Sequence, residues 1–109
     1  MKKIVFITLE KLLELLVNNE KLTIVEVLSQ EKYNEGHLPG AINIPLDDLN
    51  VLTTKILKKN EIIIVYCSSY TCHASTKAVK ILMDLGYENV LDFKAGKRGW
   101  KHSGLELEK

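Results

Sequence analysis

Two cysteines, Cys67 and Cys72, stand close together behind an apolar segment, and thiols in such a position can act as nucleophiles. Residues 62–66 predict a buried strand that ends directly before Cys67, and a helical pattern opens at about Ala74. Ligands of open α/β sheets bind beyond the carboxyl ends of the strands. Backbone N–H groups and a helix N-terminus at that place stabilise a thiolate, which is the reactive form of cysteine. The segment therefore predicts that Cys67 is a nucleophile.

Other kinds of cysteine chemistry compete with this interpretation. A phosphatase or arsenate reductase needs an arginine at the sixth position after its nucleophile, to neutralise a tetrahedral oxyanion, and His73 stands there instead. The cysteines also permit a thiol–disulfide redox protein, although four residues separate them and redox motifs usually have two. Since no second Cys/His pair accompanies them, we expect no metal site. Cys72 is either a resolving thiol for Cys67 or an inert, half-buried thiol.

The composition is typical of a single globular domain, covering residues 1–109. Hydrophobic residues make up 46% of the chain and charged residues 27%, which excludes a disordered protein. The net charge of +1 gives no general attraction to nucleic acid or to an acidic membrane, and no apolar segment approaches the roughly 20 residues of a membrane span. Since the first residues lack the pattern of a signal peptide, we expect a cytoplasmic protein with reduced thiols and no cofactor.

Strand and helix patterns alternate along the chain, which predicts a parallel sheet covered by helices on both faces, because parallel strands need crossover connections. In the helical segment 46–59 we expect Leu49, Leu52 and Ile56 to face inward, and we expect 105–109 to be a frayed tail. Strands are expected at residues 4–7, 22–27, 41–44, 61–66 and 90–93, and helical segments at 9–18, 29–34, 46–59 and 73–85, with a loop or short helix from Gly96.

Four segments in this order resemble the rhodanese-like family of sulfurtransferases. They are residues 25–27 followed by 33–45 (YNEGHLPGAINIP), the strand end Tyr66-Cys67, residues 78–87, and residues 94–100. The resemblance extends over about residues 4–105. It implies an α/β, rhodanese-like fold with a central parallel sheet of about five strands and helices on both faces.

The resemblance also implies a sulfurtransferase in which Cys67 attacks the outer sulfur of a donor and becomes a persulfide. The sulfur then passes to a thiol or another nucleophilic acceptor. Cys72 can attack such a persulfide and leave a Cys67–Cys72 disulfide. A rhodanese-type domain with an altered loop can instead be a catalytically silent binding module. The loop of Ser68, Ser69, Tyr70, Thr71 and Cys72 is expected to surround the sulfur with backbone N–H groups.

Two positions that often hold arginine in the family hold Leu28 and Cys72 here, and Arg98 is the only arginine. An anionic donor such as thiosulfate lacks its usual guanidinium partners, which favours a small-molecule or protein persulfide as the donor. The basic residues Lys94, Lys97, Arg98, Lys101 and His102 are either a solvated face or a surface that attracts an anionic donor or an acidic protein partner. The expected substrate-binding residues are Ser68, Ser69, Tyr70, Thr71, His73 and Arg98, with Cys67 and Cys72 as the catalytic residues.

Overall fold

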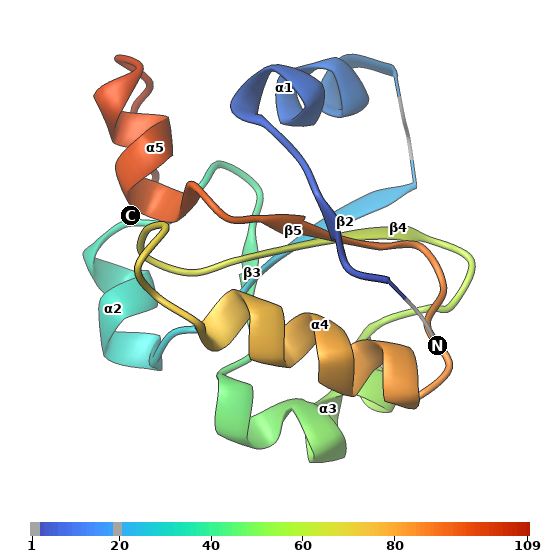
Figure 1. Cartoon of the computed structure of the whole chain (residues 1–109). Coiled ribbons are helices and arrows are strands. Elements are labelled where there is room, and N and C mark those ends of the chain that lie inside the picture. Colours follow the sequence, from blue (N-terminus) through green and yellow to red (C-terminus); the bar gives the residue numbers. More distant parts are fainter. Residues whose placement is uncertain (1–2, 19–20) are drawn as a thin grey trace.

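The computed structural model describes residues 3–18 and 21–109, and its centre is a five-stranded sheet (Figure 1). The strands lie in the order β1-β5-β4-β2-β3, and every neighbouring pair is parallel. The predicted parallel sheet is therefore confirmed, and β4 occupies its centre. The strands are β1 (Val5–Phe6), β2 (Leu22–Glu26), β3 (Ile42–Asn43), β4 (Ile62–Tyr66) and β5 (Val90–Phe93).

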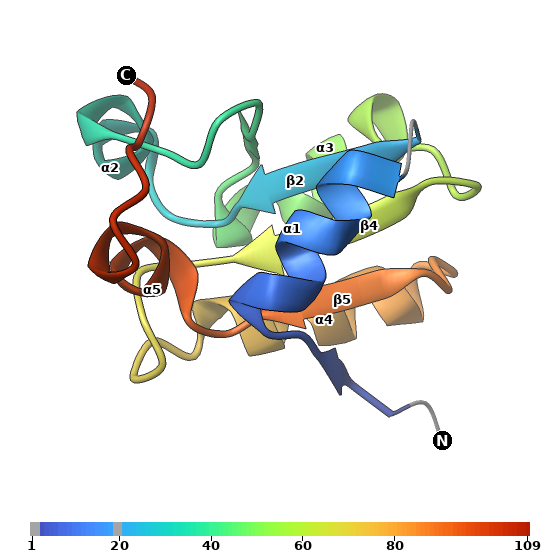
Figure 2. The same cartoon turned by 90° about the horizontal axis from the view of Figure 1, so that it is seen from above.

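Helices connect the strands and cover both faces of the sheet, with α3 and α4 on one face and α1 and α5 on the other (Figure 1). Seen from above, α2 and α5 gather beyond the carboxyl ends of the strands (Figure 2). No described helix is long and apolar enough to cross a membrane. The helices are α1 (Leu9–Asn18), α2 (Gln30–Glu35), α3 (Leu49–Ile56), α4 (Ala74–Asp84) and α5 (Gly96–His102), and the short 3-10 helix η1 (Leu46–Asp48) precedes α3.

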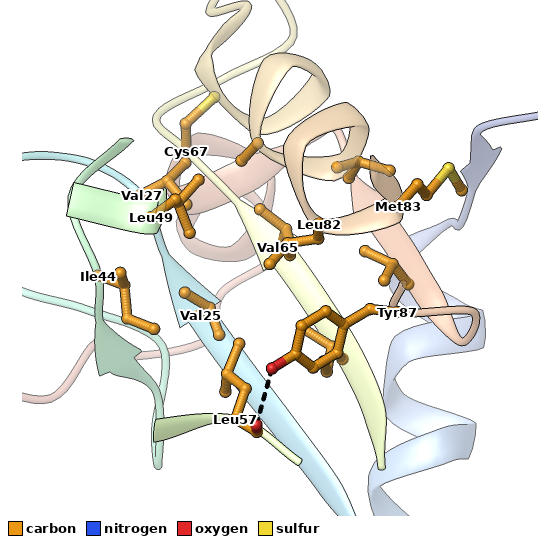
Figure 3. Packing of buried hydrophobic residues seen from close by; sticks show 14 residues of the cluster. Val25, Val27, Ile44, Leu49, Leu57, Val65, Cys67, Leu82, Met83 and Tyr87 are labelled. Carbon is orange, nitrogen blue, oxygen red and sulfur yellow. Dashed lines mark hydrogen bonds between the residues drawn. The ribbon is translucent and has the colours of Figure 1, made fainter. Parts of the chain in front are cut away.

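The side chains of β4 alternate between the two faces, so one continuous apolar strand supports two hydrophobic cores. Ile63 and Val65 belong to the core under α3 and α4. Ile64 and Tyr66 belong to the core under α1 and α5. Each aliphatic side chain buried in this way stabilises the fold by about 1.5–3 kcal/mol. Cys67 continues the alternation of Ile63 and Val65, so its side chain lies on the face of the sheet that α4 covers (Figure 3).

The inward face of α3 differs from the prediction at its last turn. Leu49 is buried and Leu52 is partly buried, as predicted, but Ile56 is 47% exposed. The helix ends at Ile56, and Leu57 follows with an extended backbone and enters the core. The prediction for Ile56 is wrong because it continues the helical spacing past the point at which the chain leaves the helix.

The C-terminal segment was expected to be a frayed tail, and this prediction is also wrong. His37 and Glu108 exchange two backbone hydrogen bonds, of 2.9 and 2.8 Å, which we call the His37–Glu108 bridge. The Glu108 carboxylate accepts a third hydrogen bond from the Gly40 N–H at 2.8 Å. Leu105 and Leu107 pack against the core under α1 and α5. These alternating apolar residues give the segment a buried side that outweighs the charges between them.

Candidate active site at the end of β4

Cys67 is the first residue after β4, and its side chain is completely buried in the core under α4. Figure 3 shows it at the end of this cluster, beyond Val27 and Leu49. Strand β4 lies between β2 and β5, so Cys67 stands at the carboxyl edge of the middle of the sheet. Ligands of α/β folds bind at this edge, which agrees with the position expected from the sequence.

The start of α5 holds the loop after Cys67 from one side. The Lys97 N–H donates to the Cys67 carbonyl at 3.1 Å. The Arg98 N–H donates to the Ser68 carbonyl at 2.9 Å. Gly96 permits this close approach, because its φ is +62° and a Cβ atom there would lie 2.3 Å from the Cys67 carbonyl oxygen. Gly96 therefore fixes where the loop carries Cys67.

The two thiols interact directly. The Cys67 thiol donates a hydrogen bond to the Cys72 carbonyl oxygen at 3.4 Å, and each thiol alters the pKa of the other. The Lys94 ammonium group donates to the same carbonyl at 2.5 Å. Both cysteines are free thiols. Because the two thiols lie close enough to influence each other, the ionisation of one depends on the state of the other.

The surroundings of the sulfurs favour ionisation of Cys72 over Cys67. Burial raises the pKa of the Cys67 thiol, and its hydrogen bond with Cys72 raises it further. Burial also opposes ionisation of Cys72, but hydrogen bonds from Cys67 and from the Ala74 and Ser68 N–H groups outweigh it, so the pKa of Cys72 is lowered. The prediction that loop N–H groups lower the pKa of Cys67 is wrong, because these groups face the Cys72 sulfur.

Ser75 is a site residue that the sequence prediction missed. It lies in the first turn of α4 and is completely buried, and its N–H and hydroxyl lower the pKa of the Cys67 thiol and so favour its thiolate. The hydroxyl has no hydrogen-bond partner among the described residues. A signal was available in the sequence: Ser75 begins the buried stripe of α4 that continues through Ala78, Val79 and Leu82. A serine on the buried face of the first turn of the helix, directly after the loop that follows the reactive cysteine, is a candidate to favour the thiolate.

Replacing Ser75 with alanine is expected to raise the pKa of Cys67 further and so to leave less thiolate at a given pH. Loss of one such polar group near the sulfur corresponds to about 1 kcal/mol, or roughly a fivefold slower alkylation of Cys67 by iodoacetamide at pH 8. The rate is measured in a Cys72→Ser background, so that only Cys67 reacts. Ser103→Ala, at an exposed serine, serves as the control. An unchanged rate in Ser75→Ala would remove Ser75 from the site.

A buried charged network lies beside the loop. Glu26, at the end of β2, is completely buried, and its carboxylate accepts a hydrogen bond from the Tyr66 hydroxyl at 2.7 Å. The Lys97 ammonium lies 3.1 Å from the other carboxylate oxygen and also donates to the Lys32 carbonyl at 2.7 Å. Burial, followed by the bond to Glu26, raises the pKa of Tyr66, so this hydroxyl stays protonated and acts as a donor. The network ties β2, β4 and α5 together under the site.

Removing the cation from this network is expected to destabilise the protein strongly. Lys97→Met leaves the Glu26 carboxylate buried without its ammonium partner, which costs about 3 kcal/mol of unfolding free energy. Urea denaturation measures the loss. The double variant Glu26→Gln/Lys97→Met is expected to recover most of it, because no buried charge remains. A loss below about 1 kcal/mol in Lys97→Met would mean that the pair behaves like a surface ion pair.

Two clefts open beside the loop, and they collect most of the predicted binding residues. The larger, of about 750 Å³, lies between α2 and α5, and the smaller, of about 340 Å³, lies between the loop and α5. Four of the five predicted basic residues line the larger cleft, which favours a role in attracting an anionic ligand. The larger cleft is lined by Ser68, Ser69, Lys97, Arg98, Lys101 and His102 with Glu35, Gly36 and Leu107, and the smaller by Ser69, Tyr70, Thr71, Ala95, Arg98, Gly99, His102 and Ser103.

His73 is the predicted binding residue that the structure leaves apart from these clefts. It is exposed at the start of α4 and lines neither of them. The fifth basic residue, Lys94, reaches the Cys72 carbonyl instead of the cleft. Within residues 3–18 and 21–109, no group of three or more His, Cys, Asp or Glu side chains is arranged to hold a metal ion.

Comparison with known proteins finds similar sequences and structures. The family model described as Rhodanese-like domain matches residues 8–103. A protein of Allochromatium vinosum named Sulfurtransferase is 28% identical over 98 residues, which cover 90% of this chain and 89% of that protein. Thiosulfate sulfurtransferase PspE of Escherichia coli is 36% identical over 67 residues, which cover 61% of this chain and 62% of PspE. Two further relatives are longer proteins, and the chain spans only 38% and 19% of their lengths.

The fold also has a solved counterpart. The crystal structure of the BH2092 protein from Bacillus halodurans superposes with a TM-score of 0.87 at 32% sequence identity. The superposition covers 95% of this chain and 76% of that one. The arrangement of strands and helices around Cys67 therefore belongs to a known fold.

Proposed function

Because the chain belongs to the rhodanese-like domain family, we propose that it is a sulfurtransferase that carries sulfur as a persulfide on Cys67. The observation that supports this most is the position of Cys67, at the carboxyl end of the central strand and beneath a loop that α5 holds in place. The names of the relatives, sulfurtransferase and thiosulfate sulfurtransferase, support the same class of reaction.

The proposed reaction has two halves. A thiolate of the protein attacks the outer sulfur of a donor persulfide, R–S–SH, and the donor leaves as the thiol R–SH. The sulfur is then held as a persulfide on Cys67, where the Ser75 N–H and hydroxyl favour its negative charge. An acceptor thiol or another nucleophile takes the outer sulfur and returns Cys67 to its thiol form. Sulfur moves at a constant oxidation level, so the cycle needs no cofactor.

We propose a small-molecule or protein persulfide as the donor, in preference to thiosulfate. Leu28 and Cys72 supply no guanidinium group for a sulfonate-like anion, and a neutral or singly charged persulfide needs none. The cations along α5 make the larger cleft the proposed place of contact for an anionic donor or an acidic protein partner. Two free thiols suit the reducing cytoplasm as the working compartment.

The test is the intact mass of the protein after incubation with glutathione persulfide and, separately, with thiosulfate, each with and without reductant. We expect a gain of one sulfur from the persulfide that reductant removes, and little gain from thiosulfate. Equal gains from both donors would overturn the preference for persulfide. No gain from either, together with an unchanged mass, would favour a catalytically silent binding module.

A thiol–disulfide redox protein is the second candidate, and the closeness of the two free thiols favours it. The same mass measurement separates the two functions. Redox chemistry gives a loss of two hydrogens that maps to Cys67 and Cys72 after mild oxidation, with no gain of sulfur. A resolving attack of Cys72 on a Cys67 persulfide gives the same disulfide, but only after sulfur has been loaded.

A further inference from the structure

The two thiols differ in their access to solvent. Cys67 is completely buried, and its sulfur is enclosed by the core under α4 and by the Cys72 carbonyl. Cys72 packs against the same core but is only partly buried. Cys72 is therefore the more accessible of the two cysteines to a donor molecule that arrives from solvent.

The hydrogen bonds around the thiols also favour Cys72 as the thiol that reacts first with the donor. The Cys72 sulfur accepts from the N–H groups of Ser68 and Ala74, which is the cradle that a thiolate needs. The Cys72 N–H is directed away from both sulfurs and donates to the Ser69 carbonyl at 3.0 Å. Cys67 keeps its proton because burial and its bond to Cys72 raise its pKa, whereas the pKa of Cys72 is lowered. The more accessible cysteine is thus also the one whose thiolate is favoured.

We propose that Cys72 is an outer thiol that takes sulfur from the donor and passes it to the inner thiol, Cys67. The proposal deepens the proposed function and rests on it, since it assigns the route by which sulfur reaches the Cys67 persulfide. It also makes Cys72 a catalytic residue of the loading step, because its sulfur touches the reacting atoms.

Each step of this route balances without an oxidant or reductant. The Cys72 thiolate attacks the outer sulfur of R–S–SH, the S–S bond of the donor breaks, and the products are Cys72–S–SH and R–S⁻, which takes a proton from water. The Cys67 sulfur then attacks the outer sulfur of Cys72–S–SH. The S–S bond to Cys72 breaks, Cys67–S–SH forms, and the proton that Cys67 donated to the Cys72 carbonyl passes to the Cys72 sulfur. An acceptor thiol draws the sulfur out by the reverse route.

The buried position of Cys67 is suited to holding the sulfur as a persulfide. A persulfide on completely buried Cys67 is screened from water and from unwanted thiols, and the Ser75 N–H and hydroxyl favour its negative charge. The Lys94 ammonium group holds the Cys72 carbonyl at 2.5 Å, so the loop keeps the two sulfurs together during transfer. An attack of Cys72 on the inner sulfur of the Cys67 persulfide would instead release sulfide and give a disulfide.

The experiment follows sulfur loading by rapid quenching after mixing with glutathione persulfide, with the modified cysteine located by fragmentation mass spectrometry. In the unaltered protein we expect sulfur on Cys72 first and on Cys67 later. Cys72→Ser is expected to load Cys67 at least tenfold more slowly while reaching the same final level, and Cys67→Ser is expected to load Cys72 at the normal rate. Loading of Cys67 at the normal rate in Cys72→Ser would overturn the relay and leave the sulfurtransferase intact.

A second measurement keeps the proposal testable without any variant. Brief treatment of the unaltered protein with iodoacetamide at pH 7 is expected to modify Cys72 well before Cys67. Modification of Cys67 first would overturn the assignment of the outer thiol. Absence of any sulfur loading in the unaltered protein would overturn the proposed function and the relay together, whichever cysteine iodoacetamide modifies first. Sulfide release with a Cys67–Cys72 disulfide would replace the relay by the resolving role.

Discussion

In a Cys72→Ser background, Cys67→Ser is expected to reduce sulfur transfer to a nucleophilic acceptor by at least about a thousandfold while the fold is retained. Serine has nearly the shape of cysteine, so the completely buried position after β4 stays filled. Its hydroxyl is a far weaker nucleophile than a thiolate and forms no persulfide. The measurement is thiocyanate formation when cyanide is added to protein loaded with glutathione persulfide, after excess donor has been removed.

The control for this result is Cys72→Ser at loading equilibrium. Cys72 alters the route of sulfur in our proposal, but Cys67 holds it, so this variant is expected to give nearly the same final yield of thiocyanate as the unaltered protein. Thermal unfolding of both variants shows whether the fold is kept. Full thiocyanate yield from the double variant Cys67→Ser/Cys72→Ser would contradict the persulfide on Cys67 and with it the proposed function.

Gly96→Ala is the second change with a large expected effect, because it moves the loop without touching a thiol. The left-handed φ of +62° costs an alanine about 1–2 kcal/mol, and the 2.3 Å contact between its Cβ and the Cys67 carbonyl adds roughly 1–3 kcal/mol of overpacking. Urea denaturation measures the total loss of unfolding free energy. The displaced loop is expected to slow sulfur loading at least tenfold.

Gly40→Ala provides a matched control. Gly40 also has a left-handed φ, of +79°, but a Cβ atom there meets nothing within 4 Å. It should therefore show the backbone cost alone, about 1–2 kcal/mol, with unchanged sulfur loading. Equal losses of unfolding free energy in the two variants would mean that the loop moves aside at no cost in free energy. Gly96 would then not fix the position of Cys67.

The features that could be predicted from the sequence are those set by local patterns. Residues 62–66 form a central strand because an apolar, β-branched segment suits burial on both faces of a parallel sheet. The position of Cys67 follows directly, since it is the next residue along the chain. The parallel sheet itself follows from the alternation of strands and helices.

The features that could not be predicted depend on partners far apart in the sequence or on the direction of single groups. The Lys97 ammonium pairs with buried Glu26 from the other half of the chain, and no spacing rule relates these residues. The direction of the loop N–H groups depends on the turn that ends at Cys72. The pattern around Cys67 therefore predicted a lowered pKa for its thiol, whereas the pKa is raised. The roles of Ser68, Ser69 and the other binding residues remain predictions.

The His37–Glu108 bridge offers a way to measure how often the larger cleft opens. Gly36 and Leu107, the neighbours of the bridged residues, line the larger cleft, so the bridge forms part of its wall. The amide hydrogens of His37 and Glu108 are both held in backbone hydrogen bonds, and they exchange with deuterium only when that wall parts. Their exchange rates therefore report how often the cleft opens in the protein without donor or acceptor.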